Sequence, residues 1–122
     1  MHRIGTDIIE IPRIARAIEG HGKSFLRRIF TEREIARYGE NIPSLAARFA
    51  AKEAVMKALG NGLFALSFRD IEVLSSPEGR PTVSLYGKAK HRANELGIKE
   101  LALSLSHCRK YATATVLACG EE

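Results

Sequence analysis

One stretch decides the expected fold of this chain: Ser44-Leu45-Ala46-Ala47-Arg48-Phe49-Ala50-Ala51-Lys52-Glu53-Ala54-Val55-Met56-Lys57-Ala58-Leu59. It predicts a long helix, which Ser44 can cap and Gly60 can end. Larger apolar side chains gather on one side of the helix and alanines on the other, so both sides can pack against neighbouring elements. Its charged residues are therefore expected to reach bulk water less freely than charges on a surface helix do.

Shorter elements are predicted on both sides of this central helix. Upstream of it are a strand over residues 4–11, a helix over residues 12–19 ended by Gly20 and Gly22, and a short helix from the Thr31–Glu34 capping box to Gly39. Downstream are strands over residues 68–74 and 82–86, a helix over 88–96, and strands over 101–107 and 111–119. Because strands and helices mix without a regular βαβ rhythm, the expected class is α+β with a mainly antiparallel sheet.

The composition predicts one small basic domain over residues 1–122. Hydrophobic residues make up 45% and charged residues 27% of the chain, which argues against intrinsic disorder. The net charge of +5 favours an anionic partner, but it does not choose among a phosphorylated small molecule, an acidic protein and nucleic acid. No apolar stretch is long enough to span a membrane, and Asp7 and Glu10 interrupt the segment where a signal peptide would need its apolar core. A soluble, cytoplasmic protein is expected.

The two cysteines, Cys108 and Cys119, are expected to remain reduced. They are too few for a disulfide scaffold and lack the C-x-x-C spacing of zinc and redox motifs. On the predicted C-terminal hairpin they also lie at opposite ends, too far apart to bond.

Two carboxylates, Asp7 and Glu53, are candidates for a cation site. Asp7 lies in an apolar strand and is either a solvent-facing or loop-capping residue or a cation ligand, with Gly5 allowing close backbone approach. Glu53 and Lys57 can form an ordinary i,i+4 ion pair, although the enclosure of their helix favours a site. Mg²⁺ fits such a pair, because it takes one or two carboxylates and completes its shell with water and substrate phosphates.

Cationic side chains supply further candidates. His107 has the strand parity of the leucines before it, which favours a structural role, yet it lies at a strand end where it can present a positive charge to phosphate. Arg13 and Arg16 share the exposed face of the first predicted helix. The sequence contains no Walker-type glycine loop, nucleophile elbow or H-E-x-x-H motif. The residues alone indicate a small basic domain with a candidate metal–phosphate site.

Three segments taken together carry a more specific signature. They are Gly5-Thr6-Asp7-Ile8, the block from Arg48 to Gly60 with its Lys-Glu-Ala-x-x-Lys core, and Ser104-Leu105-Ser106-His107. In order and spacing, over essentially the whole chain, they resemble the bacterial holo-[acyl-carrier-protein] synthase family, the short single-domain branch of the phosphopantetheinyl transferases. The turn Gly79-Arg80-Pro81 is similar to the Gly-basic-Pro turn of that family.

The resemblance implies a fold and a reaction. The fold would be 4'-phosphopantetheinyl transferase-like. A serine hydroxyl of apo-acyl carrier protein would attack the β-phosphate of coenzyme A, the phosphopantetheine arm would move to the serine, and adenosine 3',5'-bisphosphate would leave. Phosphoryl transfer rests mainly on positioning and electrostatic stabilisation, so a metal and well-placed cations suffice. The reaction would support fatty acid biosynthesis.

The resemblance also implies roles for residues of the site. Asp7 and Glu53 would bind Mg²⁺, and Glu53 and Lys57 would be catalytic, with Lys57 neutralising charge on the phosphates and Glu53 a candidate general base. Coenzyme A would be contacted by Arg48, Lys57 and His107.

The resemblance implies macromolecular partners as well. The family is trimeric with active sites at subunit boundaries, so a homotrimer is expected here. An acidic acyl carrier protein would dock on Arg13 and Arg16, for which an ordinary solvated face is the alternative. Nucleic acid and membranes are not expected partners.

Two other functions stay open at the level of sequence. The chain could be a basic binding module for nucleic acid or an acidic protein without catalysis, although its positive charges are scattered rather than grouped in a run. It could also be an inactive relative that binds coenzyme A and transfers nothing, yet every residue assigned to the site is present.

Overall fold

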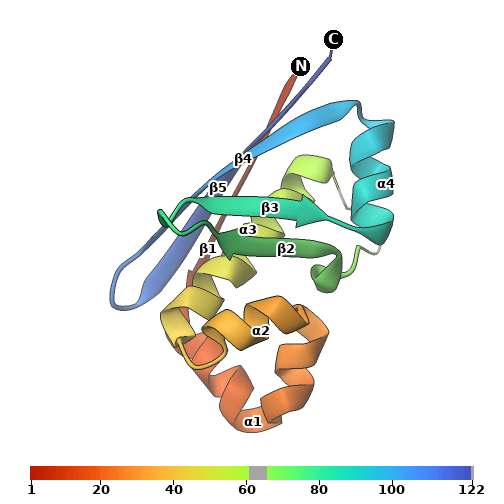
Figure 1. Ribbon diagram of the computed structural model, residues 1–122. Helices are drawn as coiled ribbons and strands as arrows, with labels where there is room; N and C mark the ends of the chain where they lie inside the picture. Colours follow the sequence, from red (N-terminus) through yellow and green to blue (C-terminus); the bar gives the residue numbers. More distant parts are fainter. Residues whose placement is uncertain (61–65, 122) are drawn as a thin grey trace.

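The computed structural model describes residues 1–60 and 66–121, and at its centre helix α3 (Ile42–Leu59) lies against strands on more than one side (Figure 1). It packs on β1 (His2–Glu10) and β5 (Tyr111–Gly120), and elsewhere on β2 (Ile71–Ser75). Both sides of α3 are buried, and Leu45, Ala51 and Leu59 have no exposed surface. The predicted enclosure of this helix is confirmed.

The strands of the described residues form two antiparallel sheets. In the first, β5 lies between β1 and β4 (Ile98–His107), so the order is β1-β5-β4. In the second, β2 pairs with β3 (Pro81–Leu85) as a hairpin. The mixed architecture with antiparallel sheets confirms the predicted α+β class. In Figure 1 the two ends of the chain lie side by side, and Gly120 N donates to Met1 O at 3.1 Å.

Residues 1–60 and 66–121 contain three further α-helices, and one of them is longer than predicted. They are α1 (Ile11–Ile29), α2 (Glu32–Tyr38) and α4 (Gly87–Glu95). The prediction that α1 ends at Gly20 and Gly22 is wrong: Gly22 leaves helical geometry at φ 51° and ψ −128°, but the chain resumes its helix beyond it. The reason is tertiary, because the second half of α1 buries Phe25 and Ile29 in the core.

The predicted N-terminal cap is right for α2 and wrong for α3. Thr31 Oγ1 accepts from the backbone N–H of Glu34, and the Glu34 carboxylate accepts from the backbone N–H of Thr31, which is a complete capping box. Helix α3 begins at Ile42 rather than Ser44, because Asn41 Oδ1 accepts from the backbone N–H of Ser44 at 3.1 Å. A proline in its first turn costs no hydrogen bond there. Gly60 ends α3 in the left-handed conformation, as predicted.

Most other boundaries lie within a residue or two of those predicted, with two exceptions. Residues Phe68–Asp70 form a short 3₁₀ helix, η2, because the Ser67 hydroxyl accepts from the backbone N–H of Arg69, so β2 begins only at Ile71. Strand β4 begins at Ile98, ahead of the alternating leucines, and has an irregular register between Ile98 and Glu100. Both cysteines are free, as predicted.

A buried ion pair ties the helices to the hairpin. Lys52 Nζ donates to Glu34 Oε1 at 2.7 Å and to the carbonyl oxygens of Phe68 and Ile71, and neither charged side chain has any exposed surface. Glu34 Oε2 also accepts from the backbone N–H of Val73 at 2.7 Å. Burial lowers the pKa of Lys52, against the opposing effect of Glu34. This pair joins α2, α3 and β2 in one core.

Within the part of the chain that the structure describes, no helix has both the length and the apolar character to cross a membrane.

Candidate active site

The candidate site forms where β1 crosses α3, and Gly5 makes that crossing possible. A Cβ atom placed on Gly5 would lie 1.9 Å from the carbonyl oxygen of Ala54, so the two backbones meet at a distance that only glycine allows. The predicted close approach at Gly5 is confirmed. It brings Asp7, two residues further along β1, to the part of α3 that carries Glu53 and Lys57.

Lys57 joins the strand to the helix at this point. Its Nζ donates to Asp7 Oδ1 at 3.0 Å and to the carbonyl oxygen of Thr6 at 3.0 Å. The Asp7 side chain is 16% exposed and that of Lys57 is 53% exposed, so the pair lies at the edge of the core and open to solvent. Among the described residues, Lys57 pairs with Asp7 rather than forming the i,i+4 ion pair with Glu53 that the sequence left open.

Glu53 lies close enough to Asp7 for the two carboxylates to influence each other. Burial raises the pKa of Glu53, the neighbouring Asp7 raises it further, and Lys57 acts in the opposite direction. Two carboxylates that repel one another in a partly buried place are stabilised by a cation between them. The structure therefore brings the predicted metal ligands together.

The donors present fit Mg²⁺. Carboxylate oxygens are the protein ligands that this ion prefers, and it usually keeps several places for water and substrate phosphates. No cluster of three or more His, Cys, Asp or Glu side chains able to hold a metal occurs in residues 1–60 and 66–121. A site of two carboxylates, completed from outside the protein, suits an ion that also holds a phosphorylated substrate.

Arg48 projects from α3 toward a different element. Its Nε donates to the carbonyl oxygen of Val73 at 3.1 Å, its Nη2 donates to Ser75 Oγ at 2.8 Å, and its guanidinium lies 3.6 Å from the centre of the Tyr38 ring. The residue is only 4% exposed. In the described chain Arg48 thus fastens α3 to β2 and α2, while Lys57 faces β1.

His107 is exposed at the end of β4, so it is not packed among the leucines whose parity it shares. In the sheet register it aligns with Ala112 of β5, which in turn aligns with Ile9 of β1. At about 4.8 Å between strands, His107 stands roughly 10 Å from the strand that carries Asp7. Arg13 and Arg16 are also exposed, on the first turns of α1.

Several residues around the site were not predicted from the sequence. Tyr38 and Ser75, which hold Arg48, come from elements far apart in the chain, and no local pattern points to them. Glu72 had a signal that was missed, because a carboxylate between Ile71 and Val73 interrupts an apolar strand just as Asp7 does. It is 4% exposed and accepts from Thr31 Oγ1 at 2.6 Å.

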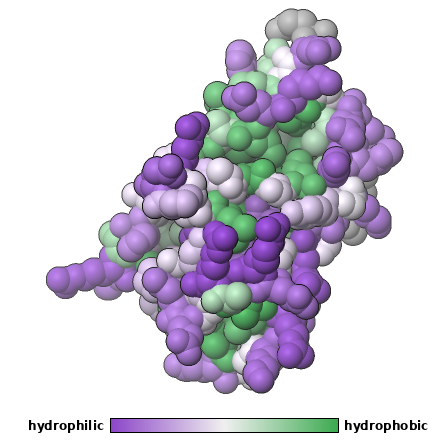
Figure 2. Space-filling model, in the orientation of Figure 1, coloured by the Kyte–Doolittle hydropathy of each residue, from purple (hydrophilic) through white to green (hydrophobic). Residues whose placement is uncertain are grey.

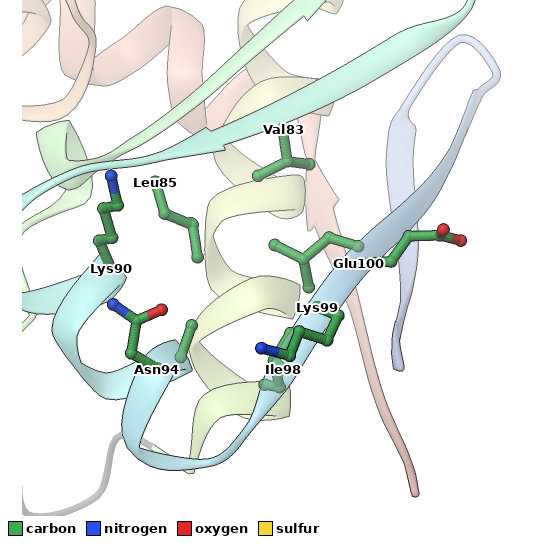
Figure 3. Close-up of a pocket in the computed structure, with 9 residues that line it drawn as sticks. Val83, Leu85, Lys90, Asn94, Ile98, Lys99 and Glu100 are labelled. Atoms are coloured by element: carbon green, nitrogen blue, oxygen red, sulfur yellow. The ribbon is translucent and has the colours of Figure 1, made fainter. Parts of the chain in front are cut away.

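A separate cavity of about 220 Å³ lies between β3, α4 and β4 (Figure 3). Figure 2 shows apolar side chains gathered at the surface in the part of the molecule where these three elements meet. Apolar and polar side chains line the cavity in similar measure, and the polar ones are Lys90, Asn94, Lys99 and Glu100. Neither Asp7 nor Glu53 lines this cavity.

Comparisons with known proteins agree with this fold. Residues 3–116 match the family model described as the 4'-phosphopantetheinyl transferase superfamily. A holo-[acyl-carrier-protein] synthase of Dehalococcoides mccartyi strain CBDB1 is 56% identical over 114 residues, which are 93% of this chain and 95% of the relative. A second, from Moorella thermoacetica, is 51% identical over 96% of this chain and 93% of the relative.

Solved structures of this family have the same fold as this chain. The Helicobacter pylori holo-[acyl-carrier-protein] synthase in complex with coenzyme A superposes with a TM-score of 0.86 at 35% identity, and the match covers 95% of this chain and 99% of that one.

The fold and the matches define the class of protein first: the chain belongs to the 4'-phosphopantetheinyl transferase superfamily. Within that class it is an enzyme of the holo-[acyl-carrier-protein] synthase family, as the resemblance implied. The predicted reaction, transfer of 4'-phosphopantetheine from coenzyme A to acyl carrier protein, is confirmed with it. Membership of an enzyme family sets aside the alternative of a basic binding module without catalysis.

Proposed function

We propose that Asp7 and Glu53 hold Mg²⁺ while the phosphopantetheine group moves from coenzyme A to a serine of apo-acyl carrier protein. The observation that carries this proposal is the crossing at Gly5, which places Asp7 beside Lys57 and within electrostatic reach of Glu53. When bound, Mg²⁺ would neutralise and orient the pyrophosphate of coenzyme A.

The residues of this chain have distinct parts in the reaction. The serine oxygen bonds to the β-phosphorus, the bond from that phosphorus to the bridging oxygen breaks, and adenosine 3',5'-bisphosphate departs with the bridging oxygen. Lys57 places a positive charge where the phosphates gain negative charge. Glu53 is our candidate for the general base, acting on the serine proton through a water molecule.

Arg48 and His107 are proposed to contact the phosphates of coenzyme A. Arg48 is nearly buried and already donates to Val73 and Ser75, so its guanidinium is fixed before binding and would meet coenzyme A only at its exposed edge. His107 lies two strands from β1 within one chain. That separation supports a site completed across a subunit boundary, to which a neighbouring subunit supplies its own His107.

We propose a homotrimer on the evidence of the sheet face that α3 does not cover. Ile4 is 69% exposed and Ile8 is 62% exposed, and both point away from α3. Tyr111, paired in register with Glu10 on the same face, is 43% exposed. Large apolar side chains on one uncovered face are typical of a protein–protein interface. We name this surface the outer sheet face.

The remaining partners and the biological role are proposals too. The acidic acyl carrier protein would dock on Arg13 and Arg16, the chain would act as one domain over residues 1–122, and the product would serve fatty acid biosynthesis. A cytoplasmic location stays a prediction.

The direct test is transfer itself. The purified chain, incubated with coenzyme A, MgCl₂ and apo-acyl carrier protein, should add the mass of one phosphopantetheine group to the carrier protein. Asp7→Asn and Glu53→Gln should each lower the rate by about 100-fold or more, because each removes charge from the proposed cation site. Glu95→Gln, at an exposed carboxylate on α4, is the matched control and should retain the parent rate.

Two results would contradict the proposal. Full activity of both site variants would contradict the assignment of Asp7 and Glu53 as ligands of Mg²⁺. A folded parent protein that binds coenzyme A but never modifies the carrier protein would show that this chain is the inactive relative that the sequence left open.

A further inference from the structure

The turn between β4 and β5, Cys108–Lys110, is held against the start of α1. The backbone N–H of Ile11 donates to the carbonyl oxygen of Lys110 at 2.7 Å, and Glu10 pairs in register with Tyr111. This contact places the turn beside the first turns of α1, although the two are almost a hundred residues apart in sequence. We name the two segments together, 10–16 and 108–110, the hairpin–helix corner.

The hairpin–helix corner is strongly basic. Arg13, Arg16, Arg109 and Lys110 are all exposed, and the acidic residue in these two segments is Glu10. Within the described residues, none of the four basic side chains forms an ion pair or a hydrogen bond. Four cations grouped around one carboxylate repel one another and do nothing for the stability of the fold. An acidic partner would replace this repulsion with attraction.

The corner is also next to the place where the other substrate is proposed to bind. His107, our candidate for contact with coenzyme A, immediately precedes the turn. In the proposed shared site this His107 would reach coenzyme A bound at the neighbouring subunit, so a carrier protein resting on the corner would lie beside the phosphates of that subunit's site. Charges around such an interface increase the rate of association and fix the orientation of the partner.

We propose that Arg109 and Lys110 extend the carrier-protein docking surface beyond Arg13 and Arg16, so that an acidic acyl carrier protein is held between α1 and the β4–β5 turn. This inference rests on the proposed function and adds two residues from a second element. The charges of the turn act on the carrier protein, not on coenzyme A.

The test is a pair of charge reversals with the same change in net charge. Arg109→Glu/Lys110→Glu changes the corner, and Lys88→Glu/Lys90→Glu changes two exposed lysines of α4. Initial rates are measured against apo-acyl carrier protein at saturating coenzyme A, and against coenzyme A at saturating carrier protein, each at low and high salt. The corner variant should raise the KM for the carrier protein about tenfold at low salt and much less at high salt, because salt screens exposed charges.

The other measurements distinguish weaker docking of the carrier protein from a loss of folding or of coenzyme A binding. The KM for coenzyme A should stay at the parent value, and Arg109→Lys/Lys110→Arg should restore the KM for the carrier protein. The thermal unfolding midpoint and the oligomeric state of the corner variant should match those of the parent. The inference is overturned if the corner variant and the α4 variant change the carrier-protein KM equally, or if the KM for coenzyme A rises as much. A parent protein that transfers nothing would refute the proposed function instead.

Discussion

Gly5 shows how one missing side chain can position a site. A single β-carbon at this residue would collide with the backbone of α3, so the strand would have to move away from the helix and take Asp7 with it. Asp7, Glu53 and Lys57 could be predicted from the sequence, because each charged group interrupts an apolar or enclosed segment. That Lys57 would pair with Asp7 rather than Glu53 could not, since only the crossing decides it.

Gly5→Ala should therefore damage both stability and activity. We expect the free energy of unfolding to fall by about 1–3 kcal/mol, the usual range for overpacking against a rigid neighbour. Phosphopantetheine transfer should fall in the protein that remains folded. Urea unfolding and the transfer assay measure the two effects.

Gly20→Ala is the matched control for this substitution. A β-carbon at Gly20 meets nothing within 4 Å, and the residue lies within α1, so alanine there should be neutral or stabilising. Equal stability of the two alanine variants would contradict the role given to Gly5.

At the scale of elements, α3 shows which structural features can be predicted from the sequence and which cannot. Its length, its C-terminal glycine and its two buried sides follow from local pattern. The continuation of α1 beyond Gly22 does not, because burial of Phe25 and Ile29 outweighs a strong local breaker. The partners of Arg48 and Lys52 lie on α2, η2 and β2, and such non-local contacts leave no periodic trace in the sequence.

The buried pair of Lys52 and Glu34 gives a prediction at this scale. Lys52→Met should lower the free energy of unfolding by about 3–5 kcal/mol, because it leaves Glu34 buried without its cation. Glu34→Gln should also destabilise, because the single amide oxygen of glutamine can accept from only one of the backbone N–H groups of Thr31 and Val73, which donate to different oxygens of Glu34.

The double variant Lys52→Met/Glu34→Gln should cost clearly less than the two single costs together, since it leaves no unpaired charge. Urea unfolding of all four proteins closes this double-mutant cycle. Strict additivity would mean that the two charges do not depend on each other.

At the scale of the whole molecule, the α+β class, the order of elements and the two hairpins could be predicted, whereas the position of β1 in the sheet needed the structure. Nothing in the spacing of β1 says that it pairs with β5 rather than with β2 or β3. The outer sheet face could not be predicted from the sequence for the same reason. The exposure of Ile4 and Ile8 depends on which side of β1 meets α3.

Ile4→Glu/Ile8→Glu should dissociate the proposed homotrimer, because it places charges where apolar side chains would be buried between subunits. Sedimentation velocity should report monomers, and the transfer rate should fall with the loss of sites shared between subunits. Ser84→Glu, at an exposed position of β3, is the control and should sediment like the parent. A parent protein that sediments as a monomer would refute the trimer directly.

The pairing of β1 with β5 also has a consequence for how the chain folds during its synthesis. The strand that carries Asp7, β1, is synthesised well before β5, its hydrogen-bonded neighbour in the sheet. Contacts of such long sequence separation close late, because loop entropy must be overcome before they form. A nascent chain can thus build α3 early, while the strand that carries Asp7 has no hydrogen-bonded neighbour in the sheet until β5 has been made.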